Sequence, residues 1–365
     1  MELSTDFDRS SRHLLTAALL REIAEPPGPV LEIGGSQGFT SDLLPNYKVT
    51  VTDVVGDDVA VRANAAAVPF RDGLFAAVIA LDVLEHVPAS MRPTILAEMA
   101  RLAGSAVIIA GPCDEPAIRD AEERTRNLYR YTAGRPHRWL GEHNDYGLPA
   151  LEEIERLLEE AGFAVTSIPT NPVEVWEPLQ LLNFAAAETG SGEPADRVHE
   201  LLNLRFLGGG DQAGTPYRRI VLGIRDGDPR AAASRVLQSL GRQGTPLSIA
   251  EANLEINRAI AETFREVVLA RQRLERFLER KQAETVGLHD VVTERATELR
   301  QLTRAYERAR SELPRLEARA RDLEAELASA RADLARTRDE AEQAVALVAE
   351  AKAAAVTANA ESELT

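Results

Sequence analysis

The pattern of apolar and polar positions predicts strands and helices that alternate along the first half of the chain. Short apolar runs predict strands near 30–33, 48–53, 76–81 and 106–110. Segments with apolar residues at helical spacing predict helices near 39–44, 57–62, 91–102 and 150–161. An amphipathic helix over 10–23 precedes the first strand and is stopped by Pro26 and Pro27. This alternation predicts a mostly parallel sheet with helices on both faces.

The last third of the chain has a different period. From about Ser248 onward Ala, Glu, Arg and Leu dominate, and apolar residues recur at spacings that alternate between three and four. Such a seam predicts a coiled coil over 248–358, joined to the first part by a linker over 227–247. A rod of about 100 residues would span about 150 Å, with a kink expected at Pro314. Because a lone helix cannot bury its seam, we expect self-association or a helical partner.

Composition narrows the choice of partners and location. The 365 residues are enough for two domains, and the net charge of −16 argues against nucleic acid as a partner. The single cysteine, Cys113, allows no intrachain disulfide and no cysteine-rich zinc site. Six histidines leave little room for a His-built metal site, so no metal site is predicted. Without a secretory signal or a long apolar run, we expect a cytoplasmic protein, with a peripheral position at the inner face of the membrane left open.

A glycine-rich turn between the first two strands carries the strongest functional signal. Gly34, Gly35 and Gly38 follow the first strand, and Asp53 ends the second. Glycines let a ligand approach the main chain closely, and the start of the next helix offers free N–H groups. An acid at the tip of the second strand can accept both hydroxyls of a ribose. The unit therefore predicts a ligand that contains a nucleoside.

The spacing Gly34-x-x-x-Gly38, with Glu32 two residues before the first glycine, resembles the class I S-adenosylmethionine (SAM) methyltransferases. An acid here suits a cationic ligand, whereas it would repel a pyrophosphate. The later segments NAAAVPF (64–70), DGLF (72–75) and LDVLEHV (81–87) resemble further motifs of this family, in particular of its small-molecule branch called type 11. The resemblance extends from about 14 to 107 and, more weakly, to 226.

This resemblance implies a Rossmann-like, doubly wound α/β sheet, mostly parallel with an antiparallel last strand, over residues 1–226, followed by the coiled coil. It also implies SAM as cofactor and a set of binding residues: Glu32, Gly34, Gly35, Gly38, Asp53, Val54, Asn64, Ala65 and Leu81. Two positions depart from the family pattern. Asn64 stands where an aspartate is common, although its amide can still accept a hydrogen bond and also donate one. Ala76 stands where an acid is common, and we expect it to affect local structure more than chemistry.

The end of the predicted sheet carries a long insertion. Phe163–Ile168 and Tyr217–Arg225 are predicted strands, and in the resembling family they form the antiparallel end of the sheet. A short turn usually joins them, but here residues of about 170–214 intervene, with helical stretches near 178–187 and 196–207. Three roles stay open for this insertion: capping the active site, forming a dimer contact, or resting on a membrane.

The segment 111–149 follows the fourth strand and is expected to be a less regular, substrate-binding loop, because polar and aromatic residues crowd it. Its candidates for contact with substrate are His137, Glu142, His143, Asp145 and Tyr146. A hydroxyl acceptor needs a general base. His143 is the first choice and Asp145 or His137 the substitutes, while His86 in the LEHV motif is expected to be structural. A carbon or neutral amine acceptor needs no base.

The acceptor is the least constrained part of the prediction. The methyltransferase type, the GEHNDYGLP segment and the C-terminal coil together resemble enzymes of bacterial surface glycans. This resemblance implies a hydroxyl of a polysaccharide or glycolipid intermediate as acceptor and a membrane-associated assembly partner. Methylation of a lipid, quinone or secondary metabolite is the alternative. A SAM-binding scaffold without activity is the second alternative.

Overall fold

The computed structural model describes residues 6–23, 27–35, 38–56, 59–240, 246–284 and 289–362. Its main unit extends to Ser311, and Glu312–Thr365 form a second unit. Within the described residues, seven strands form one sheet: β1 (Val30–Ile33), β2 (Val49–Asp53), β3 (Val61–Arg62), β4 (Phe75–Leu81), β5 (Ala103–Pro112), β6 (Ala164–Pro172) and β7 (Pro216–Ile224).

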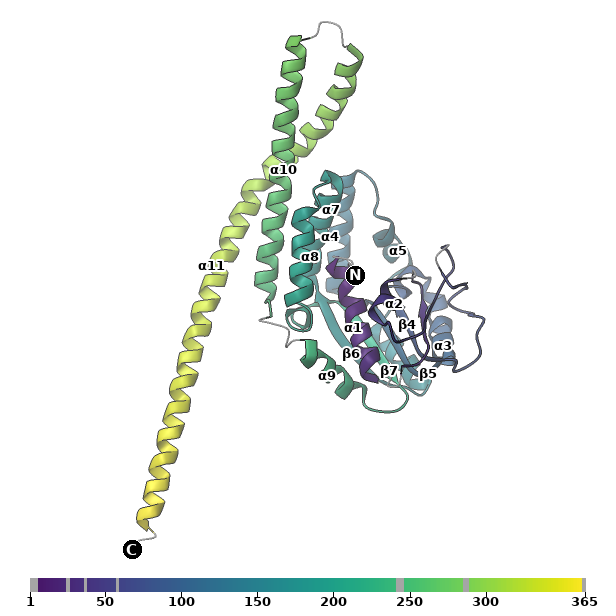
Figure 1. The fold of residues 1–365 in the computed structure, drawn as a ribbon, viewed down its shortest axis with the longest axis vertical. Helices are drawn as coiled ribbons and strands as arrows, with labels where there is room; N and C mark the ends of the chain where they lie inside the picture. The colour runs from purple at the N-terminus through teal and green to yellow at the C-terminus, as the bar shows by residue number, and fades with distance from the viewer. Residues whose placement is uncertain are drawn as a thin grey trace. The chain divides into compact units, whose positions relative to one another are not determined.

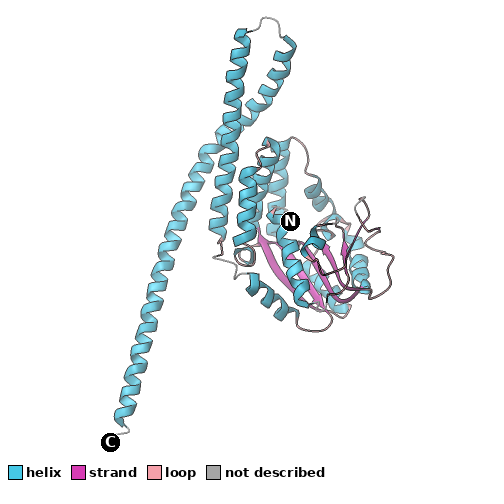
Figure 2. Cartoon of the chain, in the orientation of Figure 1, coloured by secondary structure: helices cyan, strands magenta, loops and turns pink. Residues whose placement is uncertain are grey.

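The strands lie in the order β3-β2-β1-β4-β5-β7-β6. Figure 2 shows the strands in magenta with helices around them. The five from β3 to β5 pair in parallel, and β7 runs antiparallel to both β5 and β6. This confirms the predicted mostly parallel sheet with an antiparallel last strand. Because the carboxyl ends of the parallel strands share one edge, residues that follow them are brought together there.

Apolar side chains cover both faces of the sheet, as in other parallel sheets enclosed by helices. On one face, Ile79 belongs to a buried cluster with α1 (Phe7–Ile23) and α9 (Pro229–Leu240). On the other face, its neighbour Val78 belongs to a cluster with α3 (Arg92–Leu102) and α6 (Leu151–Glu160). Figure 1 shows these helices around the sheet. The alternation along a single strand therefore fixes both layers, and α9 within the expected linker belongs to this core.

One predicted helix is wrong. In the described part of 57–62, Val61–Arg62 form strand β3, which pairs in parallel with β2, while residues 57 and 58 lie outside the described residues. The main chain on both sides continues this pairing: Ala60 N donates to Val51 O, and Ala63 N donates to Asp53 O, each at 3.0 Å. The open edge of β2 thus overrides the local helical pattern, because pairing satisfies main-chain groups there.

The segment expected to be an irregular loop, 111–149, is largely helical. It holds α4 (Pro116–Ala133) and α5 (Arg138–Tyr146), beyond the carboxyl end of β5. Together with α7 (Val173–Thr189) these helices enclose a buried cluster that includes Ile118, Leu140 and Trp176. The short elements nearby are α2 (Phe39–Leu43) and three 3₁₀ turns, η1 (Leu84–His86), η2 (Ala89–Met91) and η3 (Gly210–Gln212). The correction matters because helices hold side chains more firmly than a loop does.

The insertion forms two helices, α7 and α8 (Glu193–Arg205), and α10 (Ile249–Glu284) packs against both. Leu254, Ile256 and Ile260 on α10 are buried, so the first part of the predicted seam is used within the chain. The predicted rod is two helices, α10 and α11 (His289–Ser362), and Pro314 lies inside α11. Pairing of α11 in a coiled coil stays a prediction.

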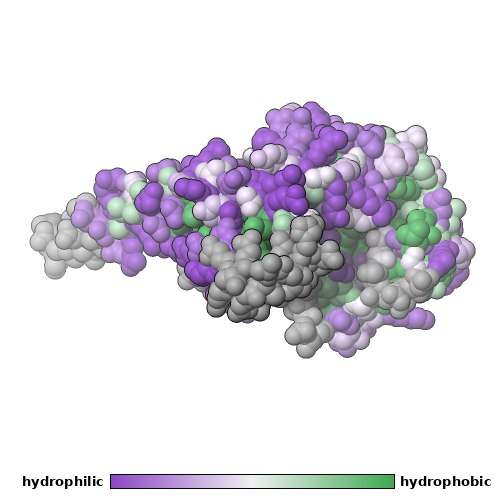
Figure 3. Space-filling model, turned by 90° about the horizontal axis from the view of Figure 1, so that it is seen from above, coloured by the Kyte–Doolittle hydropathy of each residue, from purple (hydrophilic) through white to green (hydrophobic). Residues whose placement is uncertain are grey.

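The surface gives no sign of a membrane span. None of the helices in the described residues is both long enough and apolar enough to cross a bilayer. The face shown in Figure 3 is mostly hydrophilic, with smaller hydrophobic patches.

Candidate active site

A cavity of about 780 Å³ lies at the carboxyl edge of the sheet. Its walls come from the ends of β1, β2 and β4, from the start of α1, and from α5 and α7. Six of the predicted cofactor residues line it: Gly34, Asp53, Val54, Asn64, Ala65 and Leu81. The catalytic candidates His137 and His143 line it as well. Six of the nine predicted cofactor residues and two of the three catalytic candidates thus border one cavity.

The glycines are required by local geometry. Gly34 has a φ of 76°, and a Cβ there would lie 2.5 Å from Cγ2 of Val83. A Cβ on Gly35 would lie 2.7 Å from Oε1 of Glu32, and Gly38 has a φ of 116° directly before α2. Only glycine fits such positions without strain. At Gly34 this leaves bare main chain facing the cavity, as close approach of a ligand requires.

Glu32 supports the turn from below and does not line the cavity. Its side chain is buried under Gly35, and its Oε2 has no hydrogen-bond partner among the described residues. Burial raises the pKa of Glu32 to about 7, against a hydrogen bond with Thr40 and the positive charges of Arg9 and Arg12. Keeping the buried Glu32 side chain ionised therefore costs the folded state free energy.

That cost predicts a pH-dependent effect of Glu32→Gln. The pKa of Glu32 is about 7 in the folded state, above its ordinary 4.5, so the folded protein loses stability as pH rises from 4.5 through about 7. Without SAM at about pH 8, we expect Glu32→Gln to unfold with a free energy higher than wild type by roughly 3 kcal/mol. Below about pH 4.5 the gain should vanish. Urea unfolding at both pH values measures it, with exposed Glu159→Gln as control. An equal gain at both would contradict the assignment.

The nucleoside side of the cavity has the predicted acid and an apolar surface beside it. Asp53 is the last residue of β2, and its Oδ1 accepts a hydrogen bond from Val55 N at 2.9 Å. Val54 and Val55 line the cavity with 63% and 70% of their surface exposed. The Oδ1 of Asn64 accepts from Ala66 N at 2.9 Å, which uses one of its two lone pairs. An acid for a diol, apolar surface for a flat ring and a spare amide group fit an adenosyl ligand.

A buried ion network forms the floor of the cavity where α1 meets the sheet. Arg218 on β7 is 2% exposed and binds both carboxylate oxygens of Asp82, at 2.8 and 2.7 Å. It also binds Asp8 at 2.8 Å, while Arg12 binds Asp82 at 3.1 Å. Burial disfavours the charged form of Asp82, but Arg12 and Arg218 outweigh it and lower its pKa. The network ties the first helix to the middle of the sheet.

The opposite side of the cavity holds a pair of histidines. Nδ1 of His143 lies 2.8 Å from Oε1 of Glu122, and Nδ1 of His86 lies 2.9 Å from Oε2 of Glu142. The two Nε2 atoms face each other at 3.4 Å. Tyr217 donates its hydroxyl to the same oxygen of Glu122 at 2.9 Å. Each ring is therefore oriented by an acid behind it, with Nε2 directed towards its partner.

The surroundings of the two histidines shift their pKa values in opposite directions. Burial lowers the basicity of His143, but the hydrogen bond and charge of Glu122 outweigh burial and raise its pKa. Burial and the nearby His143 lower the pKa of His86 despite Glu142. His143 therefore holds a proton more readily than His86 does.

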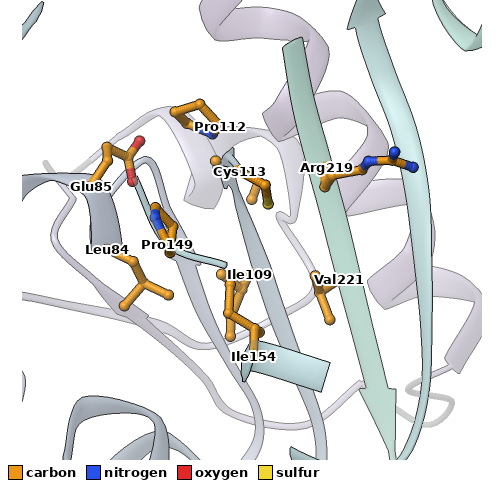
Figure 4. A pocket seen from close by; sticks show the side chains of 11 residues that line it. Leu84, Glu85, Ile109, Pro112, Cys113, Pro149, Ile154, Arg219 and Val221 are labelled. Atoms are coloured by element: carbon orange, nitrogen blue, oxygen red, sulfur yellow. The ribbon is translucent and has the colours of Figure 1, made fainter. Parts of the chain in front are cut away.

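Glu85 lies next to this pair with an unsatisfied carboxylate. It is 1% exposed, and neither carboxylate oxygen has a hydrogen-bond partner among the described residues. Burial and the charge of Asp82 raise its pKa to about 8, against the effect of His143. Figure 4 shows its carboxylate beside a small cavity of about 10 Å³, with Arg219 pointing away from it. Such a space holds about one water molecule.

The remaining catalytic candidates take other positions. Nδ1 of His137 accepts a hydrogen bond from Leu140 N at 3.3 Å, so this histidine caps the start of α5. Asp145 is exposed, lies outside the cavity, and accepts a hydrogen bond from its neighbour Asn144 at 3.3 Å. Of the three candidates, His143 is therefore the one that both lines the cavity and is oriented by an acid.

Comparison with known proteins supports what the site implies. Residues 7–168 match a protein-family model described as a methyltransferase domain. This segment contains the glycine turn, Asp53, the acids Asp82 and Glu85, and the three histidines that line the cavity, His86, His137 and His143. This match identifies the segment as a methyltransferase domain.

Several solved structures of low sequence identity are similar to part of this chain. The YcgJ protein from Bacillus subtilis has 14% identity and a TM-score of 0.35, covering 59% of this chain and 100% of its own. Magnesium protoporphyrin IX methyltransferase from Synechocystis PCC 6803, with bound SAH, has 13% identity and a TM-score of 0.34, covering 60% and 83%. A SAM-dependent methyltransferase from Archaeoglobus fulgidus has 15% sequence identity and a TM-score of 0.35, and the match covers 60% of this chain and 97% of that one. A comparison with curated protein sequences finds no significant match.

Several residues around the methyltransferase site escaped the sequence analysis. Trp176 and Gln180 on α7 line the cavity, so the insertion contributes to its wall. Trp176 stacks on Tyr217 with ring centroids 3.8 Å apart. Neither the buried Arg218 nor Glu122 stood out, because their partners come from distant parts of the chain. The one usable signal was the insertion itself, because its helix α7 lies in the wall of the cavity.

Proposed function

We propose that this methyltransferase acts on a hydroxyl group of a cell-surface polysaccharide or glycolipid intermediate. Bound SAM supplies an electrophilic methyl group and a sulfur leaving group. The chain's own residues have to place the acceptor oxygen in line and deal with its proton. The observation that carries the proposal is the oriented His86–His143 pair, which shares a cavity with the nucleoside-binding residues.

In this proposal one side of the cavity binds the cofactor and the other side binds the acceptor. On the nucleoside side, Asp53 accepts the ribose hydroxyls, Val54 and Val55 cover the adenine, and Gly34 lets the ligand lie against the main chain. Arg9 and Arg12 on α1 line the same cavity and are suited to a carboxylate. The acceptor then lies towards the histidines, where its hydroxyl is activated.

Aromatic residues favour a sugar-like acceptor. Trp139 and Tyr146 line the cavity with 49% and 40% of their surface exposed, and Trp176 lies in its wall. Aromatic rings offer flat apolar surfaces, while the nearby acids and histidines accept hydrogen bonds from hydroxyls. This combination matches a sugar ring, which has apolar faces and polar edges. Exposed rings at the mouth also suit an acceptor that continues beyond the cavity.

A small aromatic acceptor such as a quinol is the second candidate. A cavity of about 780 Å³ is within the usual range for small-molecule sites. The same rings that fit a sugar also stack on a phenol. Under both proposals, α11 provides for assembly, either with a second copy of the chain or with a membrane-associated helical partner.

We expect labelled SAM to transfer its label to fractionated cell-envelope glycans, because the acceptor side is built for a hydroxylated ring. The matched control is Asp53→Ala, which should bind SAM more weakly in calorimetry and lose transfer at limiting SAM. Label found only in small lipids or phenols would favour the second candidate. SAM binding with no transfer to any fraction, or no heat of SAM binding at all, would point to a scaffold role.

A further inference from the structure

Three potential metal ligands converge at one end of the cavity. Glu85, His86 and His143 each offer a ligand atom, and these atoms lie within 4.8 Å of one another. Glu85 and His86 come from η1, and His143 comes from α5. Two imidazoles and one carboxylate are a common donor set for divalent transition metals, with other positions left open for substrate or water.

The hydrogen bonds determine which nitrogens are free. A carboxylate accepts hydrogen bonds, so Nδ1 of His143 donates to Glu122 and Nδ1 of His86 donates to Glu142. In neutral rings both Nε2 atoms then carry lone pairs, and these face each other at 3.4 Å. Two facing lone pairs repel unless something positive lies between them. The positive charge between the two nitrogens is either a shared proton or a cation.

The distances favour a cation. With bonds of about 2.0–2.1 Å and tetrahedral angles, two imidazole nitrogens on zinc lie roughly 3.3–3.4 Å apart. The observed separation of 3.4 Å matches this value, whereas it is long for an N–H···N hydrogen bond. The ligand atoms of Glu85, His86 and His143 lie within 4.8 Å of one another, so a small movement of the side chains would complete the set.

Glu85 provides an independent observation. It is fully buried, both its oxygens lack a partner among the described residues, and it borders the cavity that the histidines line. An unpaired buried carboxylate is costly, and a bound cation would satisfy it. Glu122 and Glu142 complete the arrangement, because metal-binding histidines almost always donate their other N–H to an acid or carbonyl.

We propose that Glu85, His86 and His143 bind a divalent transition-metal ion at the acceptor end of the cavity. The two imidazoles favour Zn²⁺ and related ions over Mg²⁺, which prefers oxygen ligands. Where the proposed hydroxyl methylation holds, the ion gives the histidine pair its role. An acceptor hydroxyl bound at an open position of the ion loses its proton to solvent more readily, because the cation stabilises the oxyanion.

Cobalt(II) is the probe for the test, since its visible absorption reports nitrogen and oxygen ligands directly. The untagged, full-length chain is stripped with a chelator, kept free of SAM and titrated with Co²⁺. We expect visible bands that saturate at one equivalent, are displaced by Zn²⁺, and are not displaced by Mg²⁺. Zn²⁺ should also raise the melting temperature by mass action.

Glu85→Gln, His86→Gln and His143→Gln should each weaken Co²⁺ binding by more than the roughly 10–100-fold that loss of an outer partner costs. Glu122→Gln should fall within that range. The control is His137→Asn, which keeps a cap for α5 and should bind Co²⁺ like wild type. Absence of bands, or unchanged affinity in the three ligand variants, would overturn the site and leave a shared proton. Since SAM and acceptor are absent, the result does not depend on whether methyl transfer occurs.

Discussion

Replacing Arg218 with methionine is expected to lower the free energy of unfolding by about 3 kcal/mol, the lower end of the cost of breaking a buried ion pair. Methionine keeps much of the side-chain volume but leaves Asp82 and Asp8 without their shared cation. Both acids are partly screened, with side chains 19% and 21% exposed, which is why the lower end applies. Urea unfolding followed by circular dichroism measures the change.

The neighbouring residue on the same strand is a matched control. Arg219 makes one ion pair with Glu115, and both side chains are partly exposed, so Arg219→Met should cost less than about 1 kcal/mol. Asp82 keeps its ion pair with Arg12, so the charge that loses its ion-pair partner is that of Asp8. Adding Asp8→Asn to Arg218→Met should therefore recover part of the loss. If Arg218→Met costs no more than Arg219→Met, the network does not hold α1 on the sheet.

The sheet was predictable where its signals are local. Strands such as β1 and β4 are apolar runs buried on both faces, and the glycines of the turn after β1 lie close together in the sequence. Strand β3 was missed because its two residues are held by pairing to an open edge. Helix α4 was missed because only a few residues, such as Ile118 and Ala121, are buried along it, and charged residues cover the rest.

The site divides in the same way. The residues predicted to bind the cofactor lie between Glu32 and Leu81 in the sequence, and six of these nine line the cavity. Its histidine side is assembled across the chain: His86 and His143 are 57 positions apart, and Arg218 lies 136 positions from Asp82. The count of six histidines argued against a metal site, whereas the metal site proposed above needs only two histidines, which folding brings together.

Replacing His143 with glutamine is expected to lower kcat for methyl transfer by about 10²–10⁴, the usual range for a lost acid–base group. The SAM dissociation constant should stay within about threefold, because the residues proposed for the nucleoside lie elsewhere in the cavity. Label transfer at saturating SAM gives the first quantity, and calorimetry gives the second. Asp145→Asn, exposed and outside the cavity, should leave both unchanged. An unchanged kcat in His143→Gln would mean that the acceptor needs no activation, as for a carbon or neutral amine.

The loss is expected whether the imidazole of His143 takes the proton itself or helps to hold a cation that lowers the pKa of the hydroxyl, so that its proton passes to solvent. Wild type stripped with a chelator separates these cases, because its histidines are intact. If an ion activates the hydroxyl, stripping should lower kcat towards the level of His143→Gln, and Zn²⁺ or Co²⁺ should restore it. If stripped wild type keeps its full rate, the proton goes to the imidazole pair. Glu122→Gln should then still be slower than wild type, because Glu122 orients the ring that accepts the proton.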